Sequence, residues 1–222
     1  MAQVLLRILT ANLYNGCAEP DALGRILDAT NPDVVAAQEM APSAAAVIGD
    51  RMPHGLLLPA LDNTGSGLAA ARPMEVRRHR LPHRDALVGQ YARDGGRIVI
   101  WSVHLANPID RPPPFRQRRN QVRALQAAVD DIPGEDAVVV VGDLNATPLW
   151  PAYRRLLHSL DDGVAEWAAR AGVRPERTWA RRPGGVPLLR IDHALTRGIE
   201  VERAETILVP GSDHRALVVD LA

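Results

Sequence analysis

The stretch that most constrains the fold of this 222-residue chain is a run of four valines, Val138 to Val141, followed by Gly142. β-Branched residues favour extended backbone, and a continuous apolar run of this length indicates a strand buried on both faces. Glycine ends the run, and Asp143 and Asn145 follow two residues apart. The sequence therefore predicts a buried strand whose end presents an acid and an amide together.

The same arrangement recurs along the chain, because polar residues follow several other apolar runs. A single polar residue at the end of a strand carries little information, but a series of them predicts an assembled site. The other residues of this kind are Asn12, Glu39, His104, Asp192, Asp213 and His214.

Strand-like and helix-like segments alternate around a central block of short strands. Hydrophobic periodicity and breakers predict helices over 19–29, 43–50, 115–129, 151–158 and 163–171. Strands are predicted over 4–12, 33–38, 54–59, 67–72, 74–80, 86–91, 97–104, 137–141, 190–196, 200–209 and 216–221. Pro112 to Pro114 predict a stiff loop. This mixed order favours an α/β fold of one domain over 1–222, a four-layer α/β/β/α sandwich with two packed mixed β-sheets, over a doubly wound parallel sheet.

Composition excludes several classes of protein. The chain has 26 basic residues, all arginine, and 26 acidic residues, so it carries no net charge. This balance argues against a domain that coats nucleic acid non-specifically, although a local basic groove stays open. One cysteine, Cys17, excludes an internal disulfide framework. With neither a signal peptide nor an apolar run of membrane-spanning length, we expect a soluble, cytoplasmic protein without a membrane span, and a monomer.

The acids and amides at the strand ends are candidate metal ligands. Glu39 follows the apolar run 34–37. A carboxylate at the end of a buried strand is unfavourable unless it is solvated, paired or bound to a metal. Carboxylate and amide oxygens are the ligands that Mg²⁺ prefers. Asn12 and Glu39, with Asp213 as a third residue, offer such a set. The alternative for each acid is a solvated strand end or a helix N-cap.

Two histidines have the placement expected of acid–base groups. His104 ends an apolar strand, and His214 directly follows Asp213. Asp192 is a candidate to orient His214, and the alternative is that Asp192 forms a salt bridge with Arg190 or Arg197. For the remaining histidines, which are His54, His79, His83, His158 and His193, we expect structural or surface roles.

Taken together, these pieces resemble the signature series of the endonuclease/exonuclease/phosphatase superfamily, with its deoxyribonuclease I-like and exonuclease III-like fold. The order and spacing match over about the whole chain. The pieces are Thr10-Ala11-Asn12, Gln38-Glu39, His104-Leu105, Gly142-Asp143-Leu144-Asn145, Ile191-Asp192-His193 and Ser212-Asp213-His214. The segments 112–121 and 142–157 further resemble a bacterial subgroup of this family.

The resemblance implies metal-dependent hydrolysis of a P–O bond, with Mg²⁺ or Mn²⁺ as the cofactor. It implies that Glu39 binds the metal, with Asn12 close by and Asp213 in or near the same shell. It implies that Asp143 orients or deprotonates the attacking water, or assists the leaving oxygen. Asn145 would then hold the phosphate or that water.

The resemblance also implies that His214, oriented by Asp192, contacts the scissile phosphate and acts as an acid–base group or stabilises charge. His104 would be a second histidine facing the phosphate. Two clusters of arginines could bind a nucleic-acid backbone. One lies near His104, just after the proline loop, and consists of Arg116, Arg118 and Arg119. The other consists of Arg77, Arg78, Arg80 and Arg84. The alternative is a solvated arginine face. Trp150, Trp167 and Trp179 are expected to stack on bases or to pack in the protein.

The chain departs from the DNA-repair members of the family in leaving little room for long arms, and Phe115 is its only phenylalanine. We therefore expect a phosphodiesterase, first of all a nuclease on DNA or RNA. The alternatives are a phosphatase or phospholipase-type hydrolase that acts on small or lipid phosphoesters, and an inactive binding module on the same fold.

Overall fold

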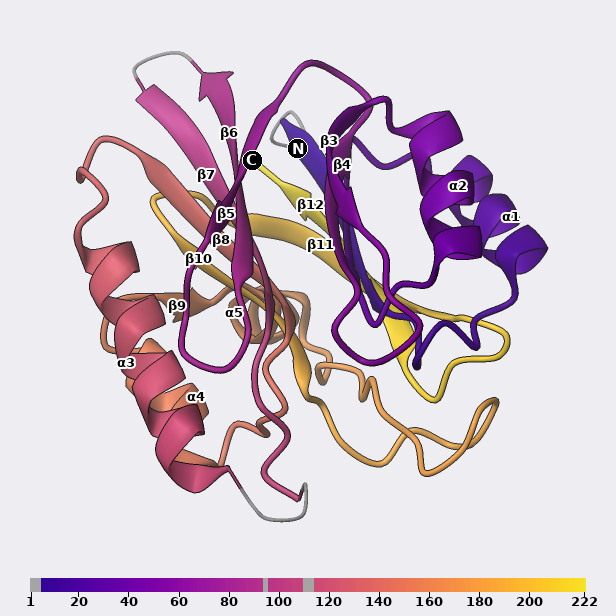
Figure 1. Ribbon diagram of the computed structural model, residues 1–222. Coiled ribbons are helices and arrows are strands. Elements are labelled where there is room, and N and C mark those ends of the chain that lie inside the picture. The colour runs from indigo at the N-terminus through magenta and orange to yellow at the C-terminus, as the bar shows by residue number, and fades with distance from the viewer. Residues whose placement is uncertain (1–4, 94–95, 110–113) are drawn as a thin grey trace.

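The computed structural model describes residues 5–93, 96–109 and 114–222. Within these residues two six-stranded sheets pack face to face, with helices on their outer faces (Figure 1). The predicted four-layer sandwich is confirmed. The first residue of the predicted strand 4–12 and two residues of the predicted proline loop lie outside the described residues.

The first sheet holds the two chain-terminal strands at its centre. Its spatial order is β11 (Val201–Leu208), β12 (Arg215–Leu221), β1 (Leu6–Asn12), β2 (Val34–Gln38), β4 (Ser66–Ala70) and β3 (His54–Leu58). The strands β1 and β2 are parallel, whereas β12 is antiparallel to β1. The ends of the chain thus help to build the sheet that carries Asn12.

The second sheet contains the valine run. Its spatial order is β5 (Glu75–His79), β6 (Ala86–Arg93), β7 (Gly96–His104), β8 (Ala137–Asp143), β10 (Asp192–Arg197) and β9 (Asp161–Asp162). Here β7 and β8 are parallel, while β10 is antiparallel to β8. All seven residues of β8 are buried, as the apolar run predicts.

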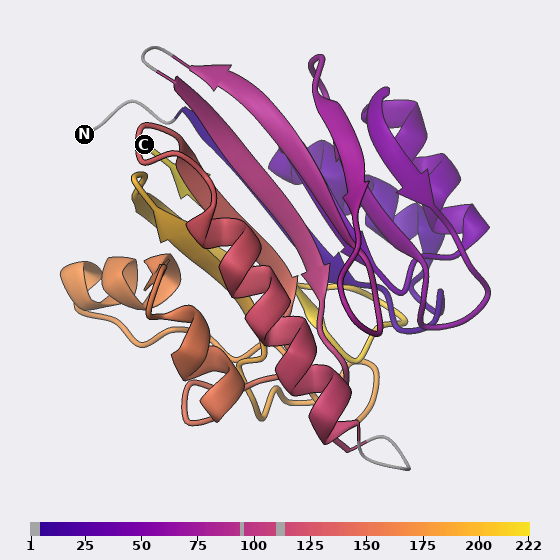
Figure 2. The same cartoon turned by 60° about the vertical axis from the view of Figure 1, so that its left-hand side comes forward.

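Helices cover the outer face of each sheet (Figure 2). The first sheet is covered by α1 (Pro20–Thr30) and α2 (Pro42–Arg51), and the second by α3 (Phe115–Asp130) and α4 (Pro151–Leu156), while α5 (Gly163–Ala171) packs against β10 and β11. Three of these helices, α1, α2 and α4, begin with proline, whose ring presets the first helical φ and whose missing N–H is not needed there.

Three hydrophobic clusters correspond to the three interfaces between the four layers. The cluster between the sheets includes Ile8, Val34 and Ile100. The clusters under the helices include Val140 with Leu125 on one side and Leu9 with Leu23 on the other. Because successive residues of a strand face opposite layers, the central strands are apolar on both faces. Polar side chains therefore gather at the strand ends.

Gly142 is required by the close approach of β7. Its φ is 131°, and a Cβ atom at this position would lie 2.1 Å from the carbonyl oxygen of Val103. Only glycine tolerates both the dihedral angle and the contact without a shift of the backbone. The glycine therefore lets β8 stay paired with β7 up to Asp143.

We expect Gly142→Ala to lower the free energy of unfolding by ~3 kcal/mol or more, because it combines backbone strain with a clash inside the sheet. Urea unfolding followed by circular dichroism measures this loss. Gly172→Ala is the matched control, since Gly172 also has positive φ but a Cβ atom added there would meet nothing within 4 Å. Equal losses in the two variants would show that the contact with Val103 has no energetic importance.

Candidate active site

The strand register of the second sheet places three of the predicted residues side by side. His104 of β7 lies opposite Asp143 of β8, and Asp143 lies opposite Asp192 of β10. These residues are 39 and 49 positions apart in the sequence, yet they lie at the same edge of the sheet, where β7 and β8 end and β10 begins. All three side chains are buried. The sheet itself thus forms one wall of the site.

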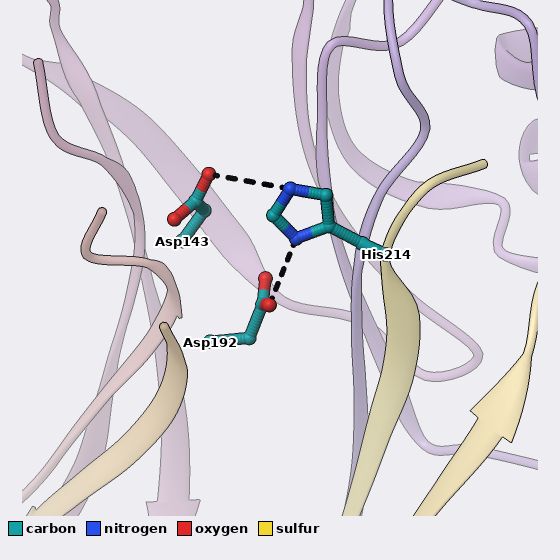
Figure 3. Close-up of side chains that lie close together, drawn as sticks. All are labelled: Asp143, Asp192 and His214. Carbon is teal, nitrogen blue, oxygen red and sulfur yellow. Dashed lines mark hydrogen bonds and ion pairs between the residues drawn. The ribbon is translucent and has the colours of Figure 1, made fainter. Parts of the chain in front are cut away.

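The first sheet supplies the opposite wall. Asn12 ends β1 opposite Gln38 of β2, and Glu39 follows Gln38 directly. Glu39 has a φ of 53°, an uncommon conformation for a non-glycine residue, and this sharp turn begins where β2 ends. His214 directly precedes β12 and reaches across to the second sheet (Figure 3).

Asp143 joins the two walls through hydrogen bonds. Its Oδ2 accepts from Nδ2 of Asn12 at 3.1 Å and from Nδ2 of Asn145 at 3.1 Å, and its Oδ1 accepts from the backbone N–H of Asn145 at 2.7 Å. Burial raises the pKa of Asp143 to about 7, against the lowering effects of nearby His214 and of these hydrogen bonds. A carboxyl with this pKa can exchange a proton near neutral pH.

Asp192 holds the imidazole of His214. Nδ1 of His214 lies 2.8 Å from Oδ2 of Asp192, and Nε2 points towards Asp143 at 4.0 Å, so that the ring lies between the two carboxylates (Figure 3). Burial alone would lower the pKa of His214, but Asp192, Asp143 and Asp213 together raise it to about 10. His214 is therefore a cation at neutral pH.

The alternative partners proposed for Asp192 are engaged elsewhere. Arg190 forms a buried ion pair with Asp162, and Arg197 donates to the backbone carbonyls of Val129 and Ile132. Asp192 also accepts no hydrogen bond at Oδ1 from any described residue. Its charge is thus directed at His214.

His104 has the opposite electrostatic character. Burial, together with the positive charges of Arg84 and His214, lowers the pKa of His104 well below its ordinary value. Nη1 of Arg84 lies 2.9 Å from Nε2 of His104, and the same Nε2 lies 3.6 Å from both Glu39 Oε1 and Asp143 Oδ2. The site therefore holds one cationic and one neutral histidine.

The carboxylates fit a divalent cation. Glu39, Asp143, Asp192 and Asp213 converge in this region, and atoms of Asp143, Asp192 and His214 lie within 4.8 Å of one another. Buried Oδ1 atoms of Asp192 and Asp213 have no hydrogen-bond partner among the described residues. Carboxylate oxygens are the ligands that a hard metal ion prefers, and Nδ1 of His214 is already bound to Asp192.

Asn12 and Asp213, both candidate metal ligands, have different hydrogen-bond partners at the site. Oδ1 of Asn12 accepts from the backbone N–H of Tyr14 at 2.9 Å, so the amide presents its nitrogen to Glu39 and Asp143. Asp213 accepts a hydrogen bond from Nε1 of Trp179 at 3.0 Å. In this structure Asn12 thus holds the carboxylates in place, while Asp213 lies on the His214 side of the site.

The site opens into a cavity of about 420 Å³. Its lining contains most of the residues expected at the site and several that the sequence did not indicate. The expected ones are Glu39, His104, Asp143, Asn145, Asp213, His214 and, among the tryptophans, Trp150 with Trp179. The others include Tyr14, Asn15, Asn63, Asn107 and Leu189, and Arg84 of the cluster expected at the surface also lines the cavity.

The arginines of α3 are divided by the structure. Arg118 is buried and donates to the backbone carbonyls of Ala106, Leu144 and Asn145, so it supports the loop that carries Asn145. Arg116 and Arg119 are exposed, and neither belongs to the described lining of the cavity. A helical spacing of three and four residues places Arg118 inward and its neighbours outward.

Both His193 and Trp167 are packed in the protein. His193 is fully buried, contacts the carbonyl of Ala146 through Nε2 at 2.8 Å and packs against the Tyr153 ring. Trp167 packs against the core between the sheets. Sequence reasoning placed Arg84 in a surface cluster and missed its contact with His104, and it also missed the backbone N–H of Asn15, which donates to Glu39 Oε2 at 2.8 Å. A backbone donor leaves no signal in side-chain patterns.

Comparison with known proteins identifies the family of the chain. The model of the Endonuclease/Exonuclease/phosphatase family matches residues 9–214. The chain therefore belongs to this family, whose members are phosphoester hydrolases that depend on divalent metal ions. A search of curated proteins found no significant match.

Solved structures show the same fold over nearly the whole chain. A structure of D. rerio TDP2 complexed with single strand DNA product has a TM-score of 0.74 at 18% identity, covering 98% of both chains. A family protein from Leptotrichia buccalis C-1013-b has a TM-score of 0.71 at 16% identity, covering 98% of this chain and 99% of that one. Sphingomyelinase C from Streptomyces griseocarneus has a TM-score of 0.65 at 16% identity, covering 97% and 98%.

Proposed function

We propose that the protein is a Mg²⁺- or Mn²⁺-dependent phosphodiesterase that cleaves DNA or RNA. The observation that carries this proposal is the convergence of His104 and Asp143 from one sheet with Glu39 and His214 from the other around a single open cavity, with Asp192 bound to His214. Acids, an amide and two histidines of unlike charge are the groups that hydrolysis of a phosphodiester needs.

We expect Glu39 to hold the metal, with Asp213 and Asn12 beside it. The carboxylate of Asp143 adjoins that of Glu39. Both carboxylates bind the Nδ2 of Asn12, which keeps them together although they come from different sheets. A bound divalent ion supplies Lewis-acid stabilisation of the charge that develops on the phosphate. The remaining chemistry belongs to the side chains.

Asp143 and Asn145 are placed to handle the attacking water. With a pKa of about 7, the Asp143 carboxylate can accept the water proton at neutral pH. The amide of Asn145 binds both Asp143 and the carbonyl of Leu105, and it thereby keeps the carboxylate oriented. As the water oxygen bonds to phosphorus, the P–O bond to the leaving group breaks. General base catalysis of this kind contributes ~10²- to 10⁴-fold in rate.

His214 is placed to act on the phosphate. Its Nε2 is the end of the ring that faces the cavity, because Nδ1 is bound to Asp192. As a cation it can donate a hydrogen bond to a phosphate oxygen and stabilise the transition state. Neutral His104, held by Arg84, contacts the other side of the same site.

Nucleic acid is the substrate class that we favour. Tyr14, Trp150 and Trp179 line the cavity, and aromatic rings of this kind stack on bases. We propose Arg116 and Arg119 as contacts for the nucleic-acid backbone outside the cavity, since both are exposed at the start of α3. The similar fold of D. rerio TDP2 has been seen with single strand DNA product, which supports this choice.

A second candidate substrate is a lipid phosphoester. Two apolar side chains that line the cavity are exposed, Ile109 at 72% and Leu189 at 37% relative accessibility. Exposed apolar residues beside a binding site are typical of contact with an apolar surface. None of the described helices has the length and apolarity that a membrane crossing requires.

The test is a hydrolysis assay with labelled single- and double-stranded DNA and RNA, a phospholipid in vesicles, and a small chromogenic diester. We expect the polynucleotides to be cleaved with Mg²⁺ or Mn²⁺ and not with chelator. Glu39→Gln should lower kcat/KM by more than ~10²-fold, because it removes a metal-holding charge. The matched control is Glu19→Gln, since Glu19 is exposed at the start of α1 and makes no side-chain cap.

Cleavage of the vesicle lipid or of the small diester without cleavage of any polynucleotide would replace nucleic acid by the second candidate. An unchanged rate for Glu39→Gln would contradict the assignment of the site. Calorimetry with Mn²⁺ provides a readout apart from activity, and the same variant should weaken Mn²⁺ binding.

A further inference from the structure

A second cavity, of about 400 Å³, lies directly beside the catalytic one. It is enclosed between the loop that joins β3 to β4 and the loop that joins β5 to β6, and it reaches the inner strands at Ser102 and Val103. Two residues, Arg84 and His104, line both cavities. The two cavities therefore adjoin at these two side chains.

The second cavity carries positive charge from one hairpin. Arg78, His83 and Arg84 line it, together with Asp85, which pairs with Arg78 at a distance of 3.7 Å. Arg78 keeps a side-chain exposure of 54% despite this pair, so its guanidinium remains accessible to a ligand. The lining residues include two arginines and one carboxylate, and Asp62 lies close enough to Arg84 for the arginine to help lower the pKa of the Asp62 carboxyl. The guanidinium group matches the oxygens of a phosphate.

The hairpin loop is built to aim Arg84 at the boundary between the cavities. The N–H of Arg84 donates to the carbonyl of Pro82 at 3.0 Å, which closes a three-residue turn centred on His83. His83 has a φ of 76°, a rare and strained conformation for a non-glycine residue. Strain of this kind is found where the backbone must place a side chain for a function. Here the turn brings Arg84 against the ring of His104.

We propose that the second cavity binds a second phosphate of the substrate, next to the scissile one, through Arg78 and Arg84 with His83 beside them. This inference rests on the proposed phosphodiesterase activity and narrows its substrate. The preferred substrates are then phosphoesters that carry a neighbouring phosphate. A polynucleotide has this chemistry, and so does a sugar or inositol that bears several phosphates.

The test uses two substrates with the same scissile bond. Thymidine 5′-(p-nitrophenyl phosphate) carries only the scissile diester, and its 3′-phosphorylated form carries a second phosphate. We expect wild-type kcat/KM to be ~10-fold or more higher for the 3′-phosphorylated form, because charge-assisted hydrogen bonds each contribute ~1.5–3 kcal/mol. Arg78→Gln should reduce this preference to less than ~3-fold.

Arg77→Gln is the matched control. Arg77 precedes Arg78 on β5, so its side chain lies on the other face of the sheet, where Arg77 pairs with Val88 of the outer cluster. It should retain the full preference for the 3′-phosphorylated substrate. Equal loss of preference in both variants would reveal only a general charge effect, and it would overturn the assignment to the second cavity.

Binding measurements separate this inference from the proposed activity. Calorimetry should show that thymidine 3′,5′-bisphosphate binds more tightly than thymidine 5′-monophosphate to the wild type, and that Arg78→Gln removes the difference. If inositol 1,4-bisphosphate bound more tightly than thymidine 3′,5′-bisphosphate, the second phosphate of the substrate would belong to a phosphorylated sugar or inositol and not to a polynucleotide. Cleavage of both diesters without preference would overturn this inference alone, whereas cleavage of neither would contradict the proposed activity.

Discussion

Asp143→Asn should lower kcat/KM by ~10²- to 10⁴-fold while the protein stays folded. Asparagine has nearly the same shape but cannot accept the proton of the attacking water. Burial raises the pKa of Asp143, which shows that the charged form is unfavourable in this environment. Removal of the charge therefore offsets the hydrogen bonds that the variant loses, and the free energy of unfolding should change by less than ~1 kcal/mol.

Steady-state hydrolysis of the chromogenic diester and urea unfolding measure the two quantities. Asp161→Asn serves as the control, because Asp161 is exposed on β9 of the same sheet and faces solvent. A loss of activity in Asp143→Asn that followed a comparable loss of stability would mean that Asp143 is structural. Retained activity would remove it from the mechanism.

Asp192→Asn should move the basic limb of the pH–rate profile to lower pH. Burial lowers the pKa of His214, and Asp192 is the largest of the influences that raise it to about 10. With asparagine at position 192 the imidazole loses its proton at a lower pH, so the cation that stabilises the phosphate is lost earlier. We expect kcat/KM to fall by ~10²-fold or more at pH 8 and by less at pH 6.

The titration of His214 can be followed by NMR without a substrate. The ring of the wild-type protein should stay protonated up to a pH near 10, and that of the variant should titrate lower. The raised folded-state pKa also means that the wild type loses stability as the pH rises from ~6.5 towards 10, since the folded state retains a proton that the unfolded chain releases. This slope should flatten in Asp192→Asn.

A double variant distinguishes orientation of His214 from an independent role of Asp192. If Asp192 acts through His214, Asp192→Asn combined with His214→Asn should be no slower than His214→Asn alone. Additive losses would show that Asp192 contributes by a separate route, such as a direct contact with the metal through its free Oδ1.

The architecture was predictable because local sequence patterns indicate the individual strands and helices. The valine run of β8 is apolar on both faces because layers cover it on both sides, and prolines mark the starts of α1, α2 and α4. Glu39, Asp143 and His214 were likewise recognisable as polar residues beside apolar strands. Each of these patterns can be recognised from a few neighbouring residues in the sequence.

The different environments of the arginines were not predictable in this way. Arg116, Arg118 and Arg119 look alike in the sequence, yet helix geometry buries Arg118 under three backbone carbonyls and leaves the other two exposed. Arg84 belonged to a cluster expected to face solvent or a nucleic-acid backbone. Its contact with His104 depends on a three-residue turn centred on His83.

The sequence by itself determined the two sheets, their covering helices and the set of polar residues at the strand ends, since periodicity and breakers act locally. Tertiary structure alone decided which of those residues meet. The pairing of β7 with β8 and of β8 with β10 aligns His104, Asp143 and Asp192, and the packing of the two sheets brings Asn12, Glu39 and His214 across to them. Burial among these neighbours then separates the pKa values of the two histidines, because a pKa depends on the charges and solvent around a group in space and not on its neighbours in sequence.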